Sequence, residues 1–164
     1  MLKLFVNLGK TLSFTEALLK AQRYCAYQDR CHQEMRFKLV QWAVYGDDLE
    51  NILAELVQEG FLDEERFARS FARGKFRMKQ WGRLRIVGEL KKRDISDYCI
   101  RAGLSEIEED IYTATLRELL SRKKEQLDPG LTPFERRQLL IRHGLSKGYE
   151  TELVQRIAIE LEKS

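Results

Sequence analysis

The sequence predicts an all-α protein of about nine helices. Apolar residues recur at helical spacing almost throughout the chain, and no convincing run alternates with a period of two. The 164 residues include only two prolines, and residue types that favour helix, such as Leu, Glu, Lys, Arg and Ala, are abundant. With 43% hydrophobic residues, these helices can bury their apolar faces in a core.

The expected helices follow one another with short connections. Their ranges are 13–28, 31–44, 48–59, 63–79, 83–93, 96–102, 105–126, 132–143 and 149–162. Helix starts are indicated by a cap residue with an acid three positions later, in the pairs Ser13 and Glu16, Asp47 and Glu50, Ser105 and Glu108, and Thr132 and Glu135. Helix stops are indicated by Gly46, Gly60, Gly103 and Gly144. The strongest loop signal is residues 127–133.

The nine helices fall into three sets of three. Aligning the middle helix of each set matches three arginines and three leucines, namely Arg36, Arg85, Arg136, Leu39, Leu90 and Leu140. The recurrence predicts a degenerate tandem repeat, and because so small a unit needs its neighbours for stability, an elongated and curved chain of modules is expected. The expected parts are an N-terminal extension at 1–12 and three-helix repeats at 13–60, 61–104 and 105–164.

Residues 66–93 form a basic stretch. They hold eleven Lys or Arg against one acid, Glu89, in a chain whose formal net charge is only +3. The flanks are mildly acidic, with net charges of −4 for residues 1–65 and −3 for residues 94–164. A block of one sign that stands between acidic flanks indicates a face that binds a polyanion. The alternative is a solvated helix surface without a partner.

The candidate binding residues come from this stretch. Spacings of three, four and seven allow its helices to present a basic stripe while apolar residues pack inward, namely Phe67, Phe71, Ile86 and Leu90. Trp81 is a candidate for stacking on a base or a partner, with a hydrophobic staple at a helix start as the alternative. The candidate DNA- or filament-binding residues are Arg69, Arg73, Lys75, Arg77, Lys79, Trp81, Arg83, Arg85, Lys91, Lys92 and Arg93.

Signals for catalysis, a metal or a cofactor are weak. The segment LGKT at 8–11 is similar to part of a phosphate-binding loop, but Leu4 stands where the first glycine belongs and no buried strand precedes it. The cysteines and His32 lack the spacing of a zinc site. His143 is expected at a helix end, where positive charge is favoured. No nucleophile with a partnered base is visible, so we expect neither an enzyme nor a cofactor.

The amino-terminal segment lacks the pattern of a signal peptide. Asn7, Gly9 and Lys10 interrupt its apolar residues, and no apolar run is long enough to span a membrane. The cysteines are odd in number and not closely paired, which is typical of reduced thiols: Cys25, Cys31 and Cys99. These features predict a cytoplasmic protein without a membrane span.

Residues 60–96, GFLDEERFARSFARGKFRMKQWGRLRIVGELKKRDIS, resemble the signature of the RecX family, bacterial regulators of the RecA recombinase. The most specific features are the acid-capped helix start LDEERFA, the basic helix that follows, and the Trp81–Gly82 pair that opens a second basic helix. The resemblance runs from about Ser13 to the last helix and includes ALLKAQRYCAYQDRCHQEMRFKL and the GLS at 144–146. Two departures bear on binding strength: Gln80 stands where members often carry Gly, and KKRDIS replaces a longer Arg-rich run.

The resemblance implies three tandem repeats related to helix-turn-helix units. It also implies a protein that binds in the groove of the RecA filament on single-stranded DNA and modulates ATP hydrolysis, strand exchange and filament growth in repair and recombination. We expect a monomer that inhibits RecA. Duplex DNA is a further expected ligand. Two alternatives stay open, a helix-turn-helix transcription regulator and a helical scaffold that binds an acidic protein. Because the middle helices offer mainly Lys and Arg, they suit phosphates better than base edges.

Overall fold

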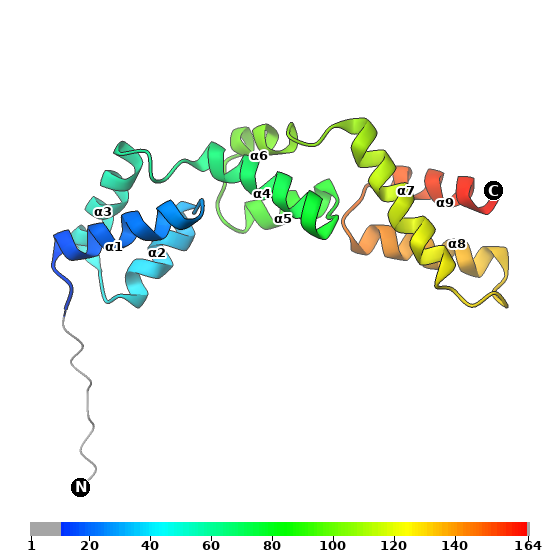
Figure 1. The fold of residues 1–164 in the computed structure, drawn as a ribbon, viewed down its shortest axis with the longest axis horizontal. Helices are drawn as coiled ribbons and strands as arrows, with labels where there is room; N and C mark the ends of the chain where they lie inside the picture. Colours follow the sequence, from blue (N-terminus) through cyan, green and yellow to red (C-terminus); the bar gives the residue numbers. More distant parts are fainter. Residues whose placement is uncertain (1–10, 164) are drawn as a thin grey trace, which may run out of the picture. The chain divides into compact units, whose positions relative to one another are not determined.

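A computed structural model describes residues 11–163, which form nine α-helices and no strand within that range (Figure 1). The all-α prediction is therefore confirmed, and so is the expected number of helices. The chain divides into two compact units, the first ending at Glu64 and the second beginning at Glu65. Residues 1–10, which include most of the expected extension and of the LGKT segment, lie outside the described residues.

The first unit contains α1 (Phe14–Tyr27), α2 (His32–Gln41) and α3 (Gly46–Gln58). A capping box opens α1, as predicted: the Ser13 hydroxyl accepts a hydrogen bond from the Glu16 N–H, and the Glu16 carboxylate accepts one from the Ser13 N–H. In the core, small side chains on α1 pack with larger apolar ones on α2 and α3, including Ala17, Ala21, Met35, Leu39, Ile52 and Leu56. Gly60 follows α3 with φ +77°, which agrees with its expected role as a stop.

The second unit contains two further sets of three helices. The first set is α4 (Glu64–Lys79), α5 (Arg83–Lys91) and α6 (Asp97–Leu104). The second set is α7 (Glu109–Glu125), α8 (Pro133–Ser146) and α9 (Thr151–Lys163). Thr132 and Glu135 form the predicted capping box at the start of α8.

The middle helix of each set carries one leucine at the equivalent position. These leucines, Leu39 on α2, Leu90 on α5 and Leu140 on α8, are all completely buried, as the tandem-repeat alignment predicts. The repeat boundaries and the elongated, curved arrangement stay predictions.

Two of the predicted helix starts are wrong. α3 begins at Gly46, after Tyr45, so Asp47 lies inside the first turn, where its negative charge still favours the helix. Ser105 ends α6 instead of starting α7, and its hydroxyl donates to the Ala102 carbonyl. The Ser105 error has a physical cause, because a short polar side chain can bond the backbone at either end of a helix.

Three of the predicted helix stops are wrong as well. Gly46 opens α3, whereas Gly103 and Gly144 lie inside α6 and α8. A Cβ at Gly103 would stand 2.7 Å from the Ala68 carbonyl oxygen, and one at Gly144 would stand 2.7 Å from a Val154 methyl. Glycine is needed at these two positions for close helix packing and not for a turn.

Backbone hydrogen bonds join the α4–α5 turn to the α8–α9 turn within the second unit. The Gly82 N–H donates to the Lys147 carbonyl at 2.8 Å, and the Leu84 N–H donates to the Gly148 carbonyl at 3.0 Å. A Cβ at Gly82 would stand 2.2 Å from the Gly148 carbonyl carbon, so only glycine permits this approach. The second and third sets of helices are therefore held together at this junction.

Tyr112 reinforces the junction from α7. Its hydroxyl accepts from the Arg83 N–H at 2.9 Å and donates to the Glu150 carboxylate at 2.7 Å, while its ring packs on Phe76 and Tyr149. Burial raises the pKa of Tyr112 well above its usual range, so the phenol stays neutral and keeps the proton that it donates.

Candidate nucleic-acid interface

The basic stretch forms α4, α5 and the turn between them. On α4 the buried residues are Phe67, Ala68, Ala72 and Phe76, which recur at helical spacing and direct the Lys and Arg side chains away from the core. Ile86 and Leu90 are buried on α5, as the sequence predicts. Phe71 is only half-buried, since its ring lies against Trp81 at the edge of the core.

Five of the candidate side chains are exposed: Arg77, Lys79, Arg85, Lys91 and Lys92. Among residues 11–163, Arg77, Lys79 and Lys91 make no ion pair, whereas Lys92 pairs with Glu89 at 2.8 Å. The charges of Arg77, Lys79 and Lys91 are therefore available to an anionic partner. We call these three residues the unpaired cations.

Other candidates are held in ion pairs within the unit. Arg69 and Arg73 both bond Glu106, at 2.9 and 3.0 Å, and Arg69 also bonds Glu65. The hydrogen bond from Arg69 is the main cause that lowers the pKa of Glu106 below its usual value. These arginines tie α4 to the segment before α7, so part of their charge is already compensated.

Arg83 and Arg93 also form ion pairs, Arg83 with acids outside the basic stretch and Arg93 with an acid inside it. Arg83 bonds Glu109 at 2.7 Å and lies 3.8 Å from Glu150. Arg93 bonds Glu89 at 3.0 Å. Both side chains are about one quarter exposed, at 23% and 26%, which suits a structural role at the junction and at the end of α5.

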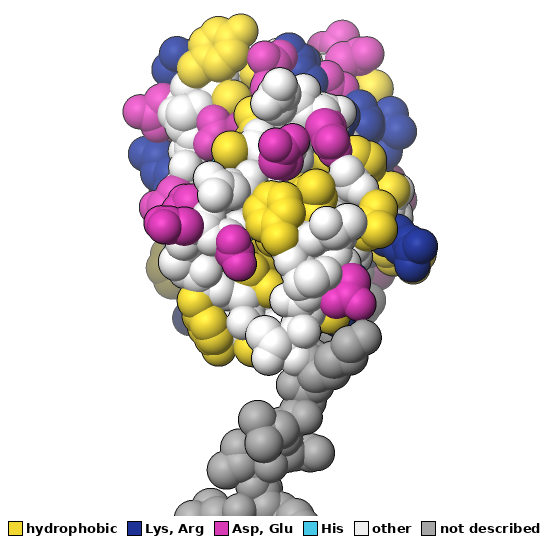
Figure 2. Space-filling view, turned by 90° about the vertical axis from the view of Figure 1, so that its left-hand side faces the viewer, with side chains coloured by type: hydrophobic (Ala, Val, Ile, Leu, Met, Phe, Trp, Pro, Cys, Tyr) yellow, Lys and Arg dark blue, Asp and Glu magenta, His cyan; other side chains and the backbone are white. Residues whose placement is uncertain are grey.

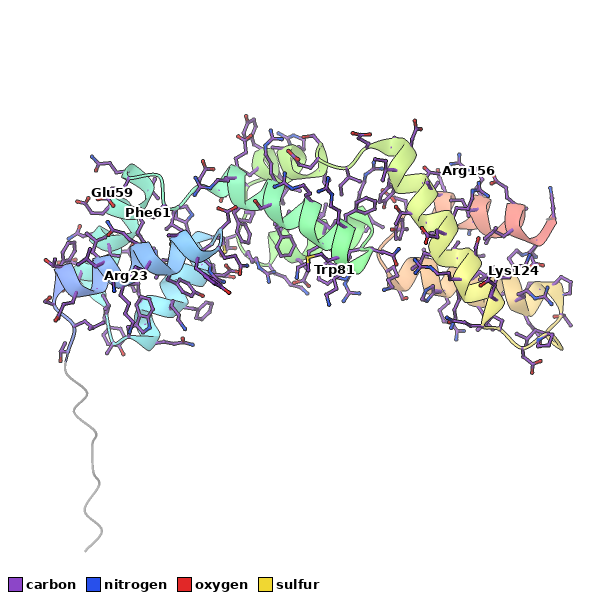
Figure 3. The ribbon with its side chains drawn as sticks, in the orientation of Figure 1. Arg23, Glu59, Phe61, Trp81, Lys124 and Arg156 are labelled. Carbon is purple, nitrogen blue, oxygen red and sulfur yellow. The ribbon has the colours of Figure 1, made fainter. Side chains whose placement is uncertain are left out.

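Trp81 lies in the α4–α5 turn (Figure 3), and two cations lie over its ring. Phe71 meets its ring edge-on with the centroids 6.4 Å apart, the Arg85 guanidinium lies 4.3 Å from its centre, and the Lys75 ammonium lies 5.1 Å away. Arg93 in turn lies over Phe71 at 5.0 Å. Contacts of this kind fix the positions of cations on an aromatic support. We call these residues the second-repeat aromatic–cation cluster.

One basic residue of the third repeat joins this surface. The Lys147 Nζ lies 3.5 Å from the Lys79 carbonyl oxygen, and the Arg85 Nη1 lies 3.5 Å from the Ser146 carbonyl oxygen. Lys147 is 68 residues away from Lys79 in the sequence. Its place depends on the junction between repeats, and no local pattern could have indicated it.

His143 lies in the last turn of α8, near the helix end where the sequence predicts it. Its charge differs from the expectation. Burial lowers the pKa of His143, and the nearby charges of Lys123 and Lys147 lower it further. The imidazole is therefore neutral at pH 7, and the positive charge expected there is disfavoured.

The lowered pKa of His143 predicts a loss of stability in mild acid. As pH falls below 6.5, the unfolded chain binds a proton at this residue more readily than the folded chain does, so the free energy of unfolding decreases until the lowered pKa is passed. Replacing His143 by Gln should flatten that part of the pH profile in urea unfolding. Replacing the exposed His32 by Gln is the control, and an equal flattening there would contradict the assignment.

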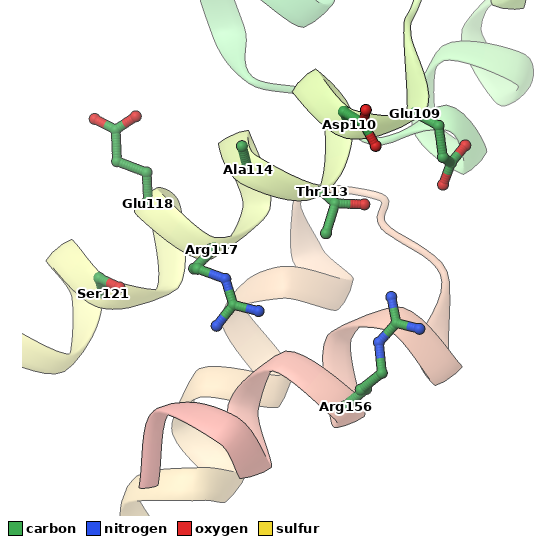
Figure 4. A pocket seen from close by; sticks show the side chains of 8 residues that line it. All are labelled: Glu109, Asp110, Thr113, Ala114, Arg117, Glu118, Ser121 and Arg156. Carbon is green, nitrogen blue, oxygen red and sulfur yellow. The ribbon is translucent and has the colours of Figure 1, made fainter. Parts of the chain in front are cut away.

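A polar groove between α7 and α9 is the alternative site. Figure 4 shows that Arg117 and Arg156 enter it from the two helices, while Glu118 points away. Glu109 and Asp110 also line it, and Arg117 is paired with Glu160. Positive and negative charges thus offset each other in the groove, in contrast to the surface around the unpaired cations.

Within residues 11–163, no group of three or more His, Cys, Asp or Glu side chains could hold a metal ion. The thiols of Cys25, Cys31 and Cys99 are buried. No helix in the same range combines the length and the apolar character that a membrane crossing needs.

Comparison with known proteins identifies relatives over most of the chain. Residues 63–104 match the family model described as RecX, second three-helix domain, and residues 109–157 match that of RecX, third three-helix domain. "Regulatory protein RecX" of Herminiimonas arsenicoxydans is 34% identical over 107 residues, which cover 63% of this chain and 67% of the relative. The protein of the same name from Haemophilus ducreyi is 31% identical over 126 residues, covering 76% and 79%.

A solved structure shows the same fold. The crystal structure of RecX from Lactobacillus salivarius superimposes with a TM-score of 0.77 at 19% sequence identity, covering 92% of this chain and 97% of that one. The relatives, the family models and the resemblance of residues 60–96 agree with one another. The chain belongs to the RecX family of regulatory proteins.

Proposed function

We propose that this chain binds the RecA filament on single-stranded DNA and inhibits the recombinase and ATPase activities of RecA in DNA repair and recombination. The observation that carries the proposal is the set of unpaired cations Arg77, Lys79 and Lys91. No described residue forms an ion pair with them, although the chain holds 26 acids. Curated relatives bear the name of a regulatory protein. The chain acts by binding, as a cytoplasmic monomer, and not by catalysing a reaction.

The binding energy comes largely from phosphates. Each exposed Lys or Arg that neutralises a phosphate releases a condensed counterion, so affinity falls steeply with salt. The second-repeat aromatic–cation cluster holds Lys75 and Arg85 in fixed places, which lowers the entropy lost on binding. Lys147 extends the same surface onto the third repeat across the junction. This surface can therefore contact a nucleic-acid backbone along both the second and the third repeat.

Inhibition follows if the chain occupies the filament along its DNA. A chain bound to the filament opposes the conformational changes that accompany ATP hydrolysis, because the ligand stabilises the state that it binds. The expected repeats at 13–60, 61–104 and 105–164 would then contact successive parts of one filament.

The test is a titration of RecA-promoted ATP hydrolysis on single-stranded DNA. We expect the rate to fall with added chain and to reach a plateau, while the chain alone hydrolyses no ATP. A rate that stays unchanged up to a severalfold excess of chain over RecA would contradict the proposal. Tight binding to one duplex sequence combined with an unchanged rate would instead favour the transcription-regulator alternative.

A further inference from the structure

The first unit contains an aromatic–cation cluster of its own. The ring of Tyr24 on α1 meets the ring of Trp42, the residue that follows α2, edge-on with the centroids 6.0 Å apart. The Lys20 ammonium lies 4.3 Å from the centre of the Trp42 ring, and the Arg30 guanidinium lies 4.1 Å from that of Tyr24. Lys38 lies near both rings, at 5.4 and 5.9 Å. These five residues are the first-repeat aromatic–cation cluster.

The cations of this cluster have no acidic partners among residues 11–163, although acids are abundant in the same unit. Residues 46–65 hold eight Asp or Glu and no Lys or Arg. Figure 2 looks onto the end of the first unit and shows Asp and Glu side chains spread over the face toward the viewer. The three cations thus stay without an ion pair among the described residues although this unit is rich in acids.

α1 carries further exposed side chains next to the cluster. Lys20, Arg23, Tyr24 and Tyr27 are spaced by three, four and seven residues and therefore share one face of that helix. Tyr27 is 85% exposed. Arg23, labelled in Figure 3, is exposed on α1 and makes no ion pair with a described residue. A large aromatic side chain left in solvent beside unpaired cations gains from a partner that covers it.

The same chemistry recurs in the second repeat. There, Phe71 and Trp81 are accompanied by Lys75, Arg85 and Arg93. In both clusters a Lys lies four residues from an aromatic residue on the first helix of the repeat, Lys20 with Tyr24 and Lys75 with Phe71. The net charges of the two regions have opposite signs, so overall charge does not explain the recurrence.

We propose that the first-repeat aromatic–cation cluster is a second binding site for single-stranded nucleic acid. Lys20, Arg30 and Lys38 would contact phosphates, and Tyr27 would offer its ring to a base. Paired aromatic and basic groups are what an unstacked polynucleotide requires, whereas an acidic protein would use only the cations. The site deepens the proposed function, since it adds a second contact with the same DNA.

Fluorescence can detect this site without interference from the second one. The chain has two tryptophans, so Trp81→Phe leaves Trp42 as the sole tryptophan and as a reporter inside the first-repeat cluster. We expect oligo-dT to quench Trp42 emission saturably. In this background, K20E/K38E should weaken binding about 10-fold or more at low salt and lower the slope of log K against log salt by about 1.4.

The matched control is R101E/K163E, which changes the net charge equally at exposed residues of the second unit. Circular dichroism checks the fold, and K20Q/K38Q repeats the measurement with a smaller change in charge. Equal affinity of K20E/K38E and the control for oligo-dT would overturn the proposal. So would polyglutamate that quenches Trp42 as strongly as oligo-dT, because the site would then recognise acidic protein.

The outcome is separable from the test of the proposed function. If the chain leaves RecA ATP hydrolysis unchanged while Trp42 is quenched by oligo-dT and K20E/K38E loses that response, the first-repeat site stands and the RecA proposal fails. If RecA is inhibited but oligo-dT does not affect Trp42, the RecA proposal stands and the first-repeat site is refuted.

Discussion

Reversing the charges of Arg77, Lys79 and Lys91 together is expected to abolish inhibition of RecA-promoted strand exchange while the helical fold stays intact. Each of these cations neutralises about one phosphate, so losing three lowers the slope of log K against log salt by about 2 and the affinity by about 100-fold or more at moderate salt. Because they are exposed and make no ion pair with residues 11–163, their removal contributes little to the free energy of unfolding.

The structure restricts the choice of residues for this variant. Arg85 packs on Trp81 and Lys92 pairs with Glu89, so replacing either would also disturb internal contacts. A matched control reverses three exposed charges elsewhere in the second unit, at Arg101, Arg142 and Lys163. If both triple variants inhibit strand exchange as well as the parent chain, the basic surface is only a solvated face.

Replacing Gly82 by Ala is expected to separate the second repeat from the third. The added Cβ would stand 2.2 Å from the Gly148 carbonyl carbon and oxygen and 2.3 Å from the Tyr149 nitrogen, all backbone atoms that no rotamer change can move away. The backbone bonds from Gly82 and Leu84 must then lengthen or break. We expect a loss of about 3 kcal/mol or more in the free energy of unfolding, and a midpoint lower by about 6 to 12 °C.

Gly88→Ala on the same helix is the control for Gly82→Ala. A Cβ at Gly88 meets nothing within 4 Å, so alanine there should stabilise the chain by about 0.5–1 kcal/mol through its higher helix propensity. Thermal unfolding followed by circular dichroism compares the two. A Gly82→Ala variant as stable as the parent would show that the repeats do not depend on the close contact at the junction.

Local signals predicted most of the fold because most of its helices are specified locally. Ser13 with Glu16 and Thr132 with Glu135 form capping boxes whose bonds lie within four consecutive residues. Gly103 and Gly144 were misleading, since the reason for glycine there is a neighbouring helix and not a turn. Tertiary contacts of this kind cannot be predicted from a local sequence pattern.

The sequence indicated the segment that carries the candidate site, but not which of its side chains form the exposed basic surface. Charge density in 66–93 indicated α4 and α5 as the basic helices, yet it could not separate unpaired cations from paired ones. The partners of Arg69, Arg73 and Arg83 lie outside the stretch, at Glu65, Glu106, Glu109 and Glu150. Lys147 was missed because only the junction places it beside Lys79.

The first-repeat cluster was missed for a different reason. Residues 1–65 carry a net charge of −4, so the charge count gave no indication of the cations that lie over Tyr24 and Trp42. The net charge of a whole segment does not show on which face of a helix the charged side chains lie. The pairing of Lys20 with Tyr24 at a spacing of four is the signal that could have revealed the cluster.

The most direct test of the basic surface is the affinity of the chain for RecA-coated single-stranded DNA, measured over a series of salt concentrations. The parent chain should bind with an affinity that falls steeply as salt rises, and the variant reversed at Arg77, Lys79 and Lys91 should bind more weakly and with a shallower slope. Identical affinities and identical slopes for the two chains would contradict a phosphate contact by the second repeat.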